Sequence, residues 1–206
     1  MNRFDEAAKT WDNKQSSIDS SNACVLNLKK HITLKENSNI LDYGCGTGFI
    51  AFALSNEKNN ILGLDYSDGM VNRFNEKVKE LNFTNLKAQK HNINEEELPK
   101  NQFDLFISSM TMHHIKDTKM FAQKAYDSLV NNGIVCINDL EKEDGTFHEK
   151  HKNDGVEHFG YKKDEVSKIF EEVGFKIISC DTVFVHERND KEYPLFNLIA
   201  QKEGKL

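Results

Sequence analysis

The chain has 206 residues, of which 38% are hydrophobic and 29% are charged, and its formal net charge at pH 7 is −6. This length and apolar fraction suit one core, so we expect residues 1–206 to form a single soluble domain. The acidic balance disfavours a broad nucleic-acid-binding face, and no run of about eighteen apolar residues could span a membrane.

The four cysteines are far apart in the sequence and contain no C-x-x-C pair; they are Cys24, Cys45, Cys136 and Cys180. Such spacing predicts neither a disulfide framework nor a zinc-binding pattern. The first residues also lack the apolar segment of a secretory signal. We therefore expect a reduced, cytoplasmic protein that acts on a small molecule.

The chain opens with a polar segment, residues 4–12, and an expected helix over about 20–31. These two segments would form an N-terminal helical cap, residues 1–33, ahead of the first strand. Phe4 and Trp11 are the large rings of the opening segment, and on the plainest interpretation they anchor it on the core.

Short apolar runs then alternate with amphipathic stretches, as expected for buried strands separated by helices. The runs are 39–42, 60–65, 85–89, 103–108 and 134–139. This β–α alternation predicts a doubly wound, mostly parallel sheet with helices on both faces, whose ligands bind beyond the carboxyl ends of the strands. The side chains expected to ring that crevice are Asp42, Asp65, Asn92, Ser108 and Asp139.

The C-terminal part begins with an expected helix over 162–173, and Gly174 has the residue type that favours a helix C-terminus. Two strands then follow, 175–186 and 192–201, on either side of a polar turn. They predict a closing hairpin, which gives an α/β sheet of seven strands with an antiparallel last strand.

The most informative segment is the turn after the first strand, Ile40-Leu41-Asp42-Tyr43-Gly44-Cys45-Gly46-Thr47-Gly48. Its three glycines permit positive φ angles and a close approach of the backbone to a ligand. A dinucleotide-binding turn would need glycine in place of Phe49, and a phosphate-binding loop would need a lysine, which this segment lacks. The carboxylate of Asp42 also repels a pyrophosphate and attracts a cation. These features favour S-adenosylmethionine, which has an ammonium and a sulfonium group.

This turn resembles the first motif of the class I S-adenosylmethionine-dependent methyltransferases, in which an acidic residue precedes G-x-G-x-G. The opening Phe4-Asp5-Glu6-Ala7-Ala8-Lys9-Thr10-Trp11-Asp12 resembles the F-D-x-x-A-x-x-Y-D start of many small-molecule members, where it closes over the cofactor. The similarity covers about residues 4–140, and within it the protein looks like the type 11 group, which includes ubiquinone and menaquinone C-methyltransferases. It implies the Rossmann-like methyltransferase fold and methyl transfer to a small-molecule acceptor, without naming that acceptor.

Asp65 ends the second expected strand and lies 21 residues after Gly44. A carboxylate about 20 residues beyond a glycine turn accepts hydrogen bonds from ribose hydroxyls in related nucleotide sites. A strand-end aspartate can also simply cap the next helix, but Ser67 or Asp68 can take that role here.

The resemblance implies further cofactor contacts. Met70 would pack on the adenine, which suits a polarisable thioether. Asn92 stands where the family usually has an aspartate that bonds the adenine amino group, and its carbonyl oxygen can still accept that bond; Asn94 is the competing position. The remaining implied contacts come from Asp42, Gly44, Cys45, Gly46, Tyr66, Ile93 and Ser108.

The segment Phe103-Asp104-Leu105-Phe106-Ile107-Ser108-Ser109-Met110-Thr111-Met112-His113-His114-Ile115 resembles the fourth-strand motif, whose end faces the transferred methyl group. A histidine there can act as a general base on a hydroxyl or amine acceptor. We favour His113 as that base over His114. The alternative is that both rings only pack and bond the backbone.

Residues 140–161 are expected to form a solvated lid over the acceptor. This stretch contains His148, His151 and His158. The first two are three residues apart and could share a helical face, a spacing compatible with a metal. Because spacing supplies no fourth ligand and a sulfonium donor needs no Lewis acid, we expect no metal in this lid.

Two other classes of function remain open at this point. A non-catalytic S-adenosylmethionine-binding sensor or partner subunit would keep the features from Asp42 to Asp65 but would need no acceptor pocket. A nicotinamide-dependent oxidoreductase could use a similar sheet, but Phe49 and Asp42 both oppose a dinucleotide.

Overall fold

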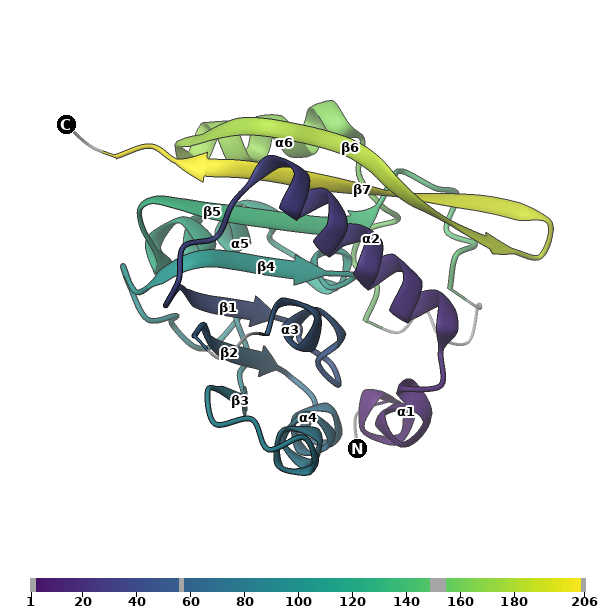
Figure 1. The fold of residues 1–206 in the computed structure, drawn as a ribbon. Helices are drawn as coiled ribbons and strands as arrows, with labels where there is room; N and C mark the ends of the chain where they lie inside the picture. Colours follow the sequence, from purple (N-terminus) through teal and green to yellow (C-terminus); the bar gives the residue numbers. More distant parts are fainter. Residues whose placement is uncertain (1–2, 56–57, 149–154, 205–206) are drawn as a thin grey trace.

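The computed structural model describes residues 3–55, 58–148 and 155–204. One seven-stranded sheet runs through the molecule in the order β3-β2-β1-β4-β5-β7-β6 (Figure 1). The strands are β1 (Asn39–Tyr43), β2 (Asn60–Asp65), β3 (Leu86–Lys90), β4 (Phe103–Ser109), β5 (Leu129–Leu140), β6 (Phe175–Arg188) and β7 (Lys191–Lys202).

The pairing of the strands confirms the expected doubly wound sheet. β1 pairs in parallel with β2 and β4, and the β2–β3 and β4–β5 pairs are also parallel. β7 is antiparallel to both β5 and β6. The last strand is therefore the antiparallel one, as the closing hairpin predicted.

Helices cover both faces of the sheet and define two cores. They are α1 (Arg3–Trp11), α2 (Gln15–His31), α3 (Phe49–Leu54), α4 (Asp68–Glu80), α5 (Thr118–Ser128) and α6 (Lys163–Val173), with a short 3-10 turn η1 (Met112–His114). Buried side chains of α2, α3 and α4 pack on one face, and those of α5 and α6 pack on the other. The carboxyl ends of the parallel strands therefore open between these two layers.

The two largest differences from the predicted boundaries are at the starts of β5 and α2. β5 begins at Leu129 and pairs with Phe103 before a register shift, because the polar run Asn131-Asn132-Gly133 forms an irregularity inside the strand. α2 begins at Gln15 rather than near residue 20, and its N-cap Lys14 makes no side-chain cap bond that would mark the start. The C-terminus of α6 matches expectation, since Gly174 has a φ of 114°.

The closing hairpin is longer and tighter than expected. Its strands extend to Arg188 and Lys191, and Asn189 and Asp190 take φ angles of 49° and 58°. Two successive positive φ angles are typical of the turns that best match strand twist. Figure 1 shows this hairpin projecting beyond the other strands.

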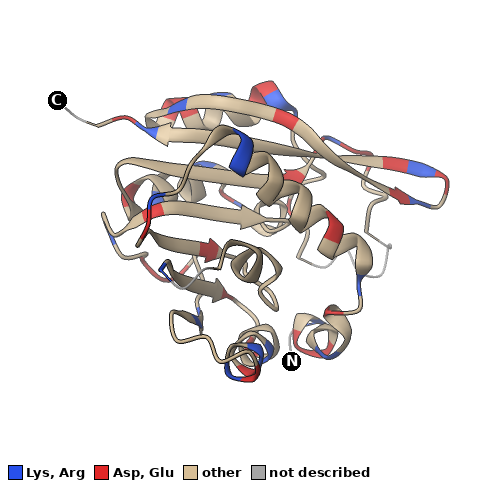
Figure 2. Cartoon of the chain, in the orientation of Figure 1, with Lys and Arg blue, Asp and Glu red and all other residues tan. Residues whose placement is uncertain are grey.

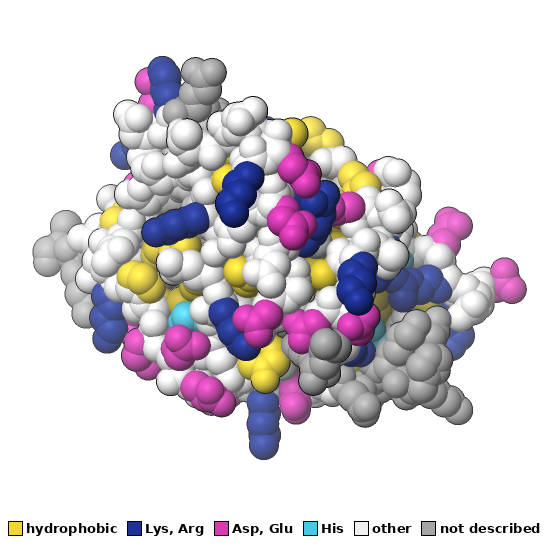
Figure 3. Space-filling view, turned by 90° about the horizontal axis from the view of Figure 1, so that it is seen from below, with side chains coloured by type: hydrophobic (Ala, Val, Ile, Leu, Met, Phe, Trp, Pro, Cys, Tyr) yellow, Lys and Arg dark blue, Asp and Glu magenta, His cyan; other side chains and the backbone are white. Residues whose placement is uncertain are grey.

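Charged side chains of both signs are interspersed over the chain (Figure 2) and over the face seen from below (Figure 3). Neither view shows the extended basic area that nucleic-acid binding would require. Within the described residues, no helix combines the length and apolar character needed to cross a membrane.

Candidate active site

The glycine turn after β1 adopts positive φ angles at all three glycines, namely 71° at Gly44, 53° at Gly46 and 97° at Gly48. A Cβ on Gly44 would lie 2.0 Å from the Thr111 hydroxyl oxygen, and a Cβ on Gly48 would strike the rings of Phe52 and Phe74. Those two glycines are thus required by the packing of the protein itself.

Gly46 differs from its neighbours. The nearest atom to a Cβ built there is the indole nitrogen of Trp11, at 3.8 Å, so the space beside it is open. An open position at the centre of a strand-end turn is what a bound cofactor would fill. The structure therefore supports the predicted cofactor contact most directly at Gly46.

Asp65 braces this turn from the end of β2. Its Oδ2 accepts the Gly46 N–H at 2.8 Å, and its Oδ1 accepts the Ser67 N–H at 2.9 Å. Burial is the main influence on this carboxyl and raises its pKa, against the opposing effect of these N–H donors. Each carboxylate oxygen has a second lone pair, so Asp65 can hold the turn and also accept ribose hydroxyls.

Asp42 is only 1% exposed, and its Oδ2 has no hydrogen-bond partner among the described residues. Burial, and then the charge of Asp65, raise the pKa of Asp42 to about 7. Among the other unpartnered buried atoms of the described structure, Ser108 Oγ and Asn138 Oδ1 lie near the carboxyl ends of the neighbouring strands β4 and β5. A buried carboxylate with an unpartnered oxygen suits a ligand that carries a positive charge and hydrogen-bond donors.

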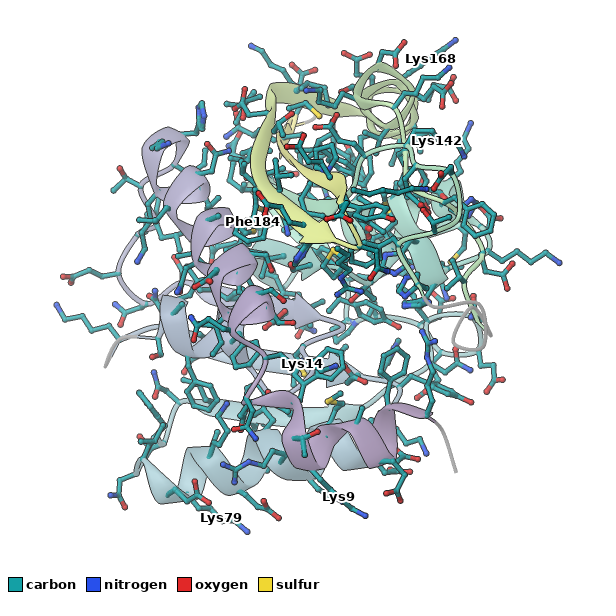
Figure 4. The ribbon with its side chains drawn as sticks, turned by 90° about the vertical axis from the view of Figure 1, so that its right-hand side faces the viewer. Lys9, Lys14, Lys79, Lys142, Lys168 and Phe184 are labelled. Atoms are coloured by element: carbon teal, nitrogen blue, oxygen red, sulfur yellow. The ribbon has the colours of Figure 1, made fainter. Side chains whose placement is uncertain are left out.

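Helix α1 closes one side of the turn. Asp12, just after the helix, accepts the Thr47 hydroxyl at 2.7 Å and pairs with Lys77 at 2.9 Å and Arg73 at 3.1 Å on α4. At the other end, Asp5 accepts the Ser67 hydroxyl at 2.6 Å. Figure 4 shows α1 beside α4, with Lys9 and Lys79 pointing outward. The opening segment thus lies beside the glycine turn, and its closure over a cofactor stays a prediction.

The residues predicted on the adenine side have varied surroundings. Met70 and Ile93 are each 2% exposed, and the Ile93 N–H donates to the Tyr43 hydroxyl at 3.0 Å. Tyr66 is 57% exposed. Asn92 Oδ1 accepts the N–H of Asn94 at 3.1 Å, which forms a local turn.

The thiol of Cys45 packs against Gly63, where a Cβ would lie 2.8 Å from the sulfur. Its side chain therefore faces the core rather than the open side of the turn. The adenine contacts of Met70, Asn92 and Ile93, together with those of Cys45 and Tyr66, stay predictions.

Beyond β4, the turn η1 brings two histidines to the same edge of the sheet. His113 is 1% exposed, and its Nδ1 lies 2.7 Å from Oδ1 of Asp139 at the end of β5. The His113 backbone N–H also donates to Asp139 Oδ2 at 3.2 Å. Burial opposes ionisation of Asp139, but His113 and the N–H donors outweigh burial and lower the pKa of this carboxyl.

His148 and His114 complete a cluster around His113. His148 Nε2 lies 3.2 Å from His113 Nε2, while His114 Nδ1 lies 2.7 Å from the Gly155 carbonyl oxygen. Burial is the main cause that lowers the pKa of His148 to about 4 and that of His114 to about 3, so both rings are neutral at pH 7. Phe4 of α1 packs edge-on against His114, with ring centroids 5.6 Å apart.

Of the three histidines in the expected lid, the described structure places only His148 next to His113. His148 lies in a bend rather than on a helix, and His151 lies outside the described residues. His158 faces the other way, with its Nε2 3.0 Å from the Ile115 carbonyl oxygen. The His148–His113 contact spans 35 residues, and no local pattern could have indicated it. The His113–Asp139 pair could have been anticipated, because Asp139 lies near the carboxyl end of β5 and His113 follows the neighbouring parallel strand β4.

The doubly wound sheet, the strand-end glycine turn with its unpartnered carboxylate, and the bracing aspartate on β2 define a Rossmann-like methyltransferase domain. The sequence model of the family described as "Methyltransferase domain" matches residues 34–196, and the chain belongs to that family. S-adenosylmethionine is its methyl donor.

Similar proteins agree with this assignment. An uncharacterised methyltransferase of Schizosaccharomyces pombe is 35% identical over 121 residues, which cover 55% of this chain and 43% of that protein. A demethylmenaquinone methyltransferase of Listeria welshimeri is 27% identical over 143 residues, 63% of this chain and 60% of that protein. The chain thus spans about half the length of these curated relatives. An S-adenosylmethionine-dependent methyltransferase from Aquifex aeolicus has a TM-score of 0.74 at 25% identity, over 96% of this chain and 98% of that structure.

We expect Gly46→Ala to weaken S-adenosylmethionine binding, because the added methyl group would enter the open space beside the turn. Overfilling a packed site costs about 1–3 kcal/mol. Gly155→Ala is the matched control, since Gly155 also has a positive φ, of 82°, and no atom of the described residues lies within 4 Å of an added Cβ. Calorimetry on both folded variants decides the matter; equal affinities would show that the cofactor does not lie against Gly46.

We expect Asp65→Asn to weaken cofactor binding by about 1.5–3 kcal/mol, the typical contribution of a hydrogen bond to a charged group. Asp104→Asn is the control: Asp104 Oδ2 also accepts a backbone N–H, that of Asn39 at 2.8 Å, but at the opposite edge of the sheet. A loss below about 0.5 kcal/mol for Asp65→Asn would remove Asp65 from the ribose site.

We also expect the ligand-free protein to lose stability as pH rises from about 4 to about 7. The pKa of Asp42 is higher in the folded chain than its ordinary value of 3.8, so folding favours the protonated form. Asp42→Asn should therefore gain stability relative to wild type over this pH range, by up to ~4 kcal/mol. Thermal melts of both proteins from pH 4 to pH 8 measure the difference, and a difference independent of pH would contradict the assignment.

Proposed function

We propose that this chain transfers a methyl group from S-adenosylmethionine to a small-molecule acceptor, with His113 on the acceptor side. The observation that supports this most is the adjacency of two half-sites. Thr111 contacts Gly44 of the cofactor turn, and two residues later His113 meets Asp139. The donor cradle and a candidate base therefore belong to one continuous edge of the sheet.

The bound cofactor supplies a methyl group that its sulfonium already activates. The chain then has to align the acceptor with that methyl group and exclude water, and positioning of this kind can lower a barrier by ~7–11 kcal/mol. Asp42 holds the cationic end of the cofactor, Gly46 admits it to the turn, and Asp65 fixes the ribose. Helix α1 closes the mouth through the Asp12 ion pairs.

His113 is oriented for proton transfer by Asp139. The contact of Nδ1 with the carboxylate assigns the ring proton to Nδ1 and leaves a lone pair on Nε2, the nitrogen that lies 3.2 Å from His148 Nε2. An imidazole held in this way can take a proton on Nε2 from a hydroxyl or amine as the methyl group is transferred. Asp139 is thus the positioning residue and His113 the catalytic one.

Residues 140–161 form the acceptor side of the proposed site. Their described ends are tied to the core, since Tyr161 N–H donates to Leu140 O at 2.9 Å and the Glu157 N–H donates to His113 O at 3.0 Å. Between these ties, Phe147 packs edge-on against His148 and Tyr193. We propose that this segment opens and closes over the acceptor as a lid, with residues 1–33 as the cofactor-side cap of the same domain.

The small size of the acceptor and a cytoplasmic location are part of the same proposal. The absence of a basic area on the viewed face supports a small molecule over a nucleic acid. All four cysteines are free thiols, and three are buried, which suits a reducing compartment.

We expect His113→Ala to lower turnover by about 10²–10⁴-fold with little change in cofactor affinity, because a base contributes in the transition state. Turnover is measured as S-adenosylhomocysteine release over a panel of hydroxyl, amine, thiol and activated-carbon acceptors. His31→Ala, at the far end of α2, is the control. A less than tenfold effect on the best acceptor would reduce His113 to a packing residue.

The same panel tests methyl transfer itself. If the wild-type protein binds S-adenosylmethionine tightly and no acceptor class yields S-adenosylhomocysteine, the chain is a cofactor-binding sensor or partner subunit instead.

A further inference from the structure

Three imidazoles from two distant segments converge beside the proposed acceptor site. One ring nitrogen from each of His113, His114 and His148 lies within 4.8 Å of the other two. The ring centroids are 4.1 Å apart for His113 and His114 and 5.2 Å apart for His113 and His148. Three histidines gathered so closely make a group of borderline nitrogen ligands with no carboxylate among the ligating atoms.

The outer partners of His113 and His114 fix which nitrogen of each ring carries the proton. Asp139 holds Nδ1 of His113 at 2.7 Å, and the Gly155 carbonyl holds Nδ1 of His114 at 2.7 Å. Each bond places a proton on Nδ1 and a lone pair on Nε2. A carboxylate or carbonyl behind the imidazole is the usual support of a metal-binding histidine.

We propose that His113, His114 and His148 bind one divalent transition-metal cation of the zinc type through their ring nitrogens. Two zinc–nitrogen bonds of about 2.0–2.1 Å at a tetrahedral angle place their nitrogens about 3.3–3.4 Å apart. His113 Nε2 and His148 Nε2 are already separated by 3.2 Å. A ring nitrogen of His114 lies within 4.8 Å of the other two, and the His114 ring moves closer to complete the set.

This set differs from the one weighed in the sequence. The spacing of His148 and His151 offered two ligands on one segment, whereas the fold joins His148 to the pair that follows β4. A hydrogen bond between the two rings would explain the His113–His148 contact, but it would not explain why His114 also lies in the cluster. Coordination gives all three rings a common partner.

Three protein ligands leave a fourth position of a tetrahedral zinc site open. That the methyl acceptor binds at this fourth position rests on the proposed function. A hydroxyl or thiol acceptor bound there loses its proton to water, its oxygen or sulfur forms a bond to the methyl carbon, and the methyl–sulfur bond breaks to leave S-adenosylhomocysteine. The cation then occupies the lone pair of His113, so activation of the acceptor passes from the imidazole to the cation.

The test measures metal binding without cofactor or acceptor. Untagged full-length protein, freed of metal by a chelator, is titrated with Co²⁺ and followed by visible absorption, and Zn²⁺ affinity is obtained by competition. We expect one equivalent to bind with a tetrahedral spectrum. His148→Ala and His114→Ala should each weaken binding by at least about 100-fold, since even loss of an outer partner costs about 10–100-fold.

Asp139→Asn should weaken metal binding by about 10–100-fold, because Asp139 is an outer partner of His113. His158→Ala and His31→Ala serve as controls with unchanged metal binding. Circular dichroism checks that each variant is folded. The proposal is overturned if the wild-type protein binds less than one equivalent, or if both ligand variants bind like the controls. Metal binding without S-adenosylhomocysteine release would contradict the proposed methyl transfer and leave the metal site supported. S-adenosylhomocysteine release without metal binding would contradict the metal site and leave the proposed methyl transfer supported.

Discussion

The contact between Asp139 and His113 is the interaction on which the acceptor side of this structure depends. It joins the end of β5 to the turn that follows β4, and both partners are almost fully buried. A buried carboxylate is tolerated only when donors surround it, and here the His113 ring, the His113 N–H and the Leu140 N–H supply them. The same bond fixes which imidazole nitrogen faces His148. One hydrogen-bonded pair therefore sets both the local fold of η1 and the chemistry available at its surface.

The cofactor side uses two aspartates in opposite ways. Asp65 is satisfied by the N–H groups of Gly46 and Ser67, so it holds the turn in shape whether or not a ligand is bound. Asp42 is left with an unpartnered oxygen, and its burial raises its pKa to about 7. The ionised form of such a carboxylate is poorly stabilised until a cation binds next to it. The site therefore favours a cationic ligand over a neutral or anionic one. A dinucleotide pyrophosphate would meet the wrong sign of charge at this position.

Much of the architecture could be predicted because local signals agree with the fold. Apolar runs placed β1 to β4 to within one residue at each end, and the glycines after β1 marked the turn. The start of β5 was missed because Asn131, Asn132 and Gly133 interrupt its apolar pattern. The histidine cluster could not be predicted in full: His113 was found from a motif, but His148 reaches it only through a long excursion of the chain. Contacts of that kind depend on tertiary structure, and neither helical nor strand periodicity encodes them.

The central claim is that the cofactor turn and the Asp139–His113 pair are two halves of one methyl-transfer site. A crystal structure of the protein with S-adenosylhomocysteine tests this most directly, because it locates the sulfur atom that held the methyl group. We expect the amino group of this ligand to approach Asp42 and its sulfur to face the Nε2 edge of His113, with room for one acceptor group between them. A sulfur atom turned away from His113, or a ligand bound outside the glycine turn, would contradict it.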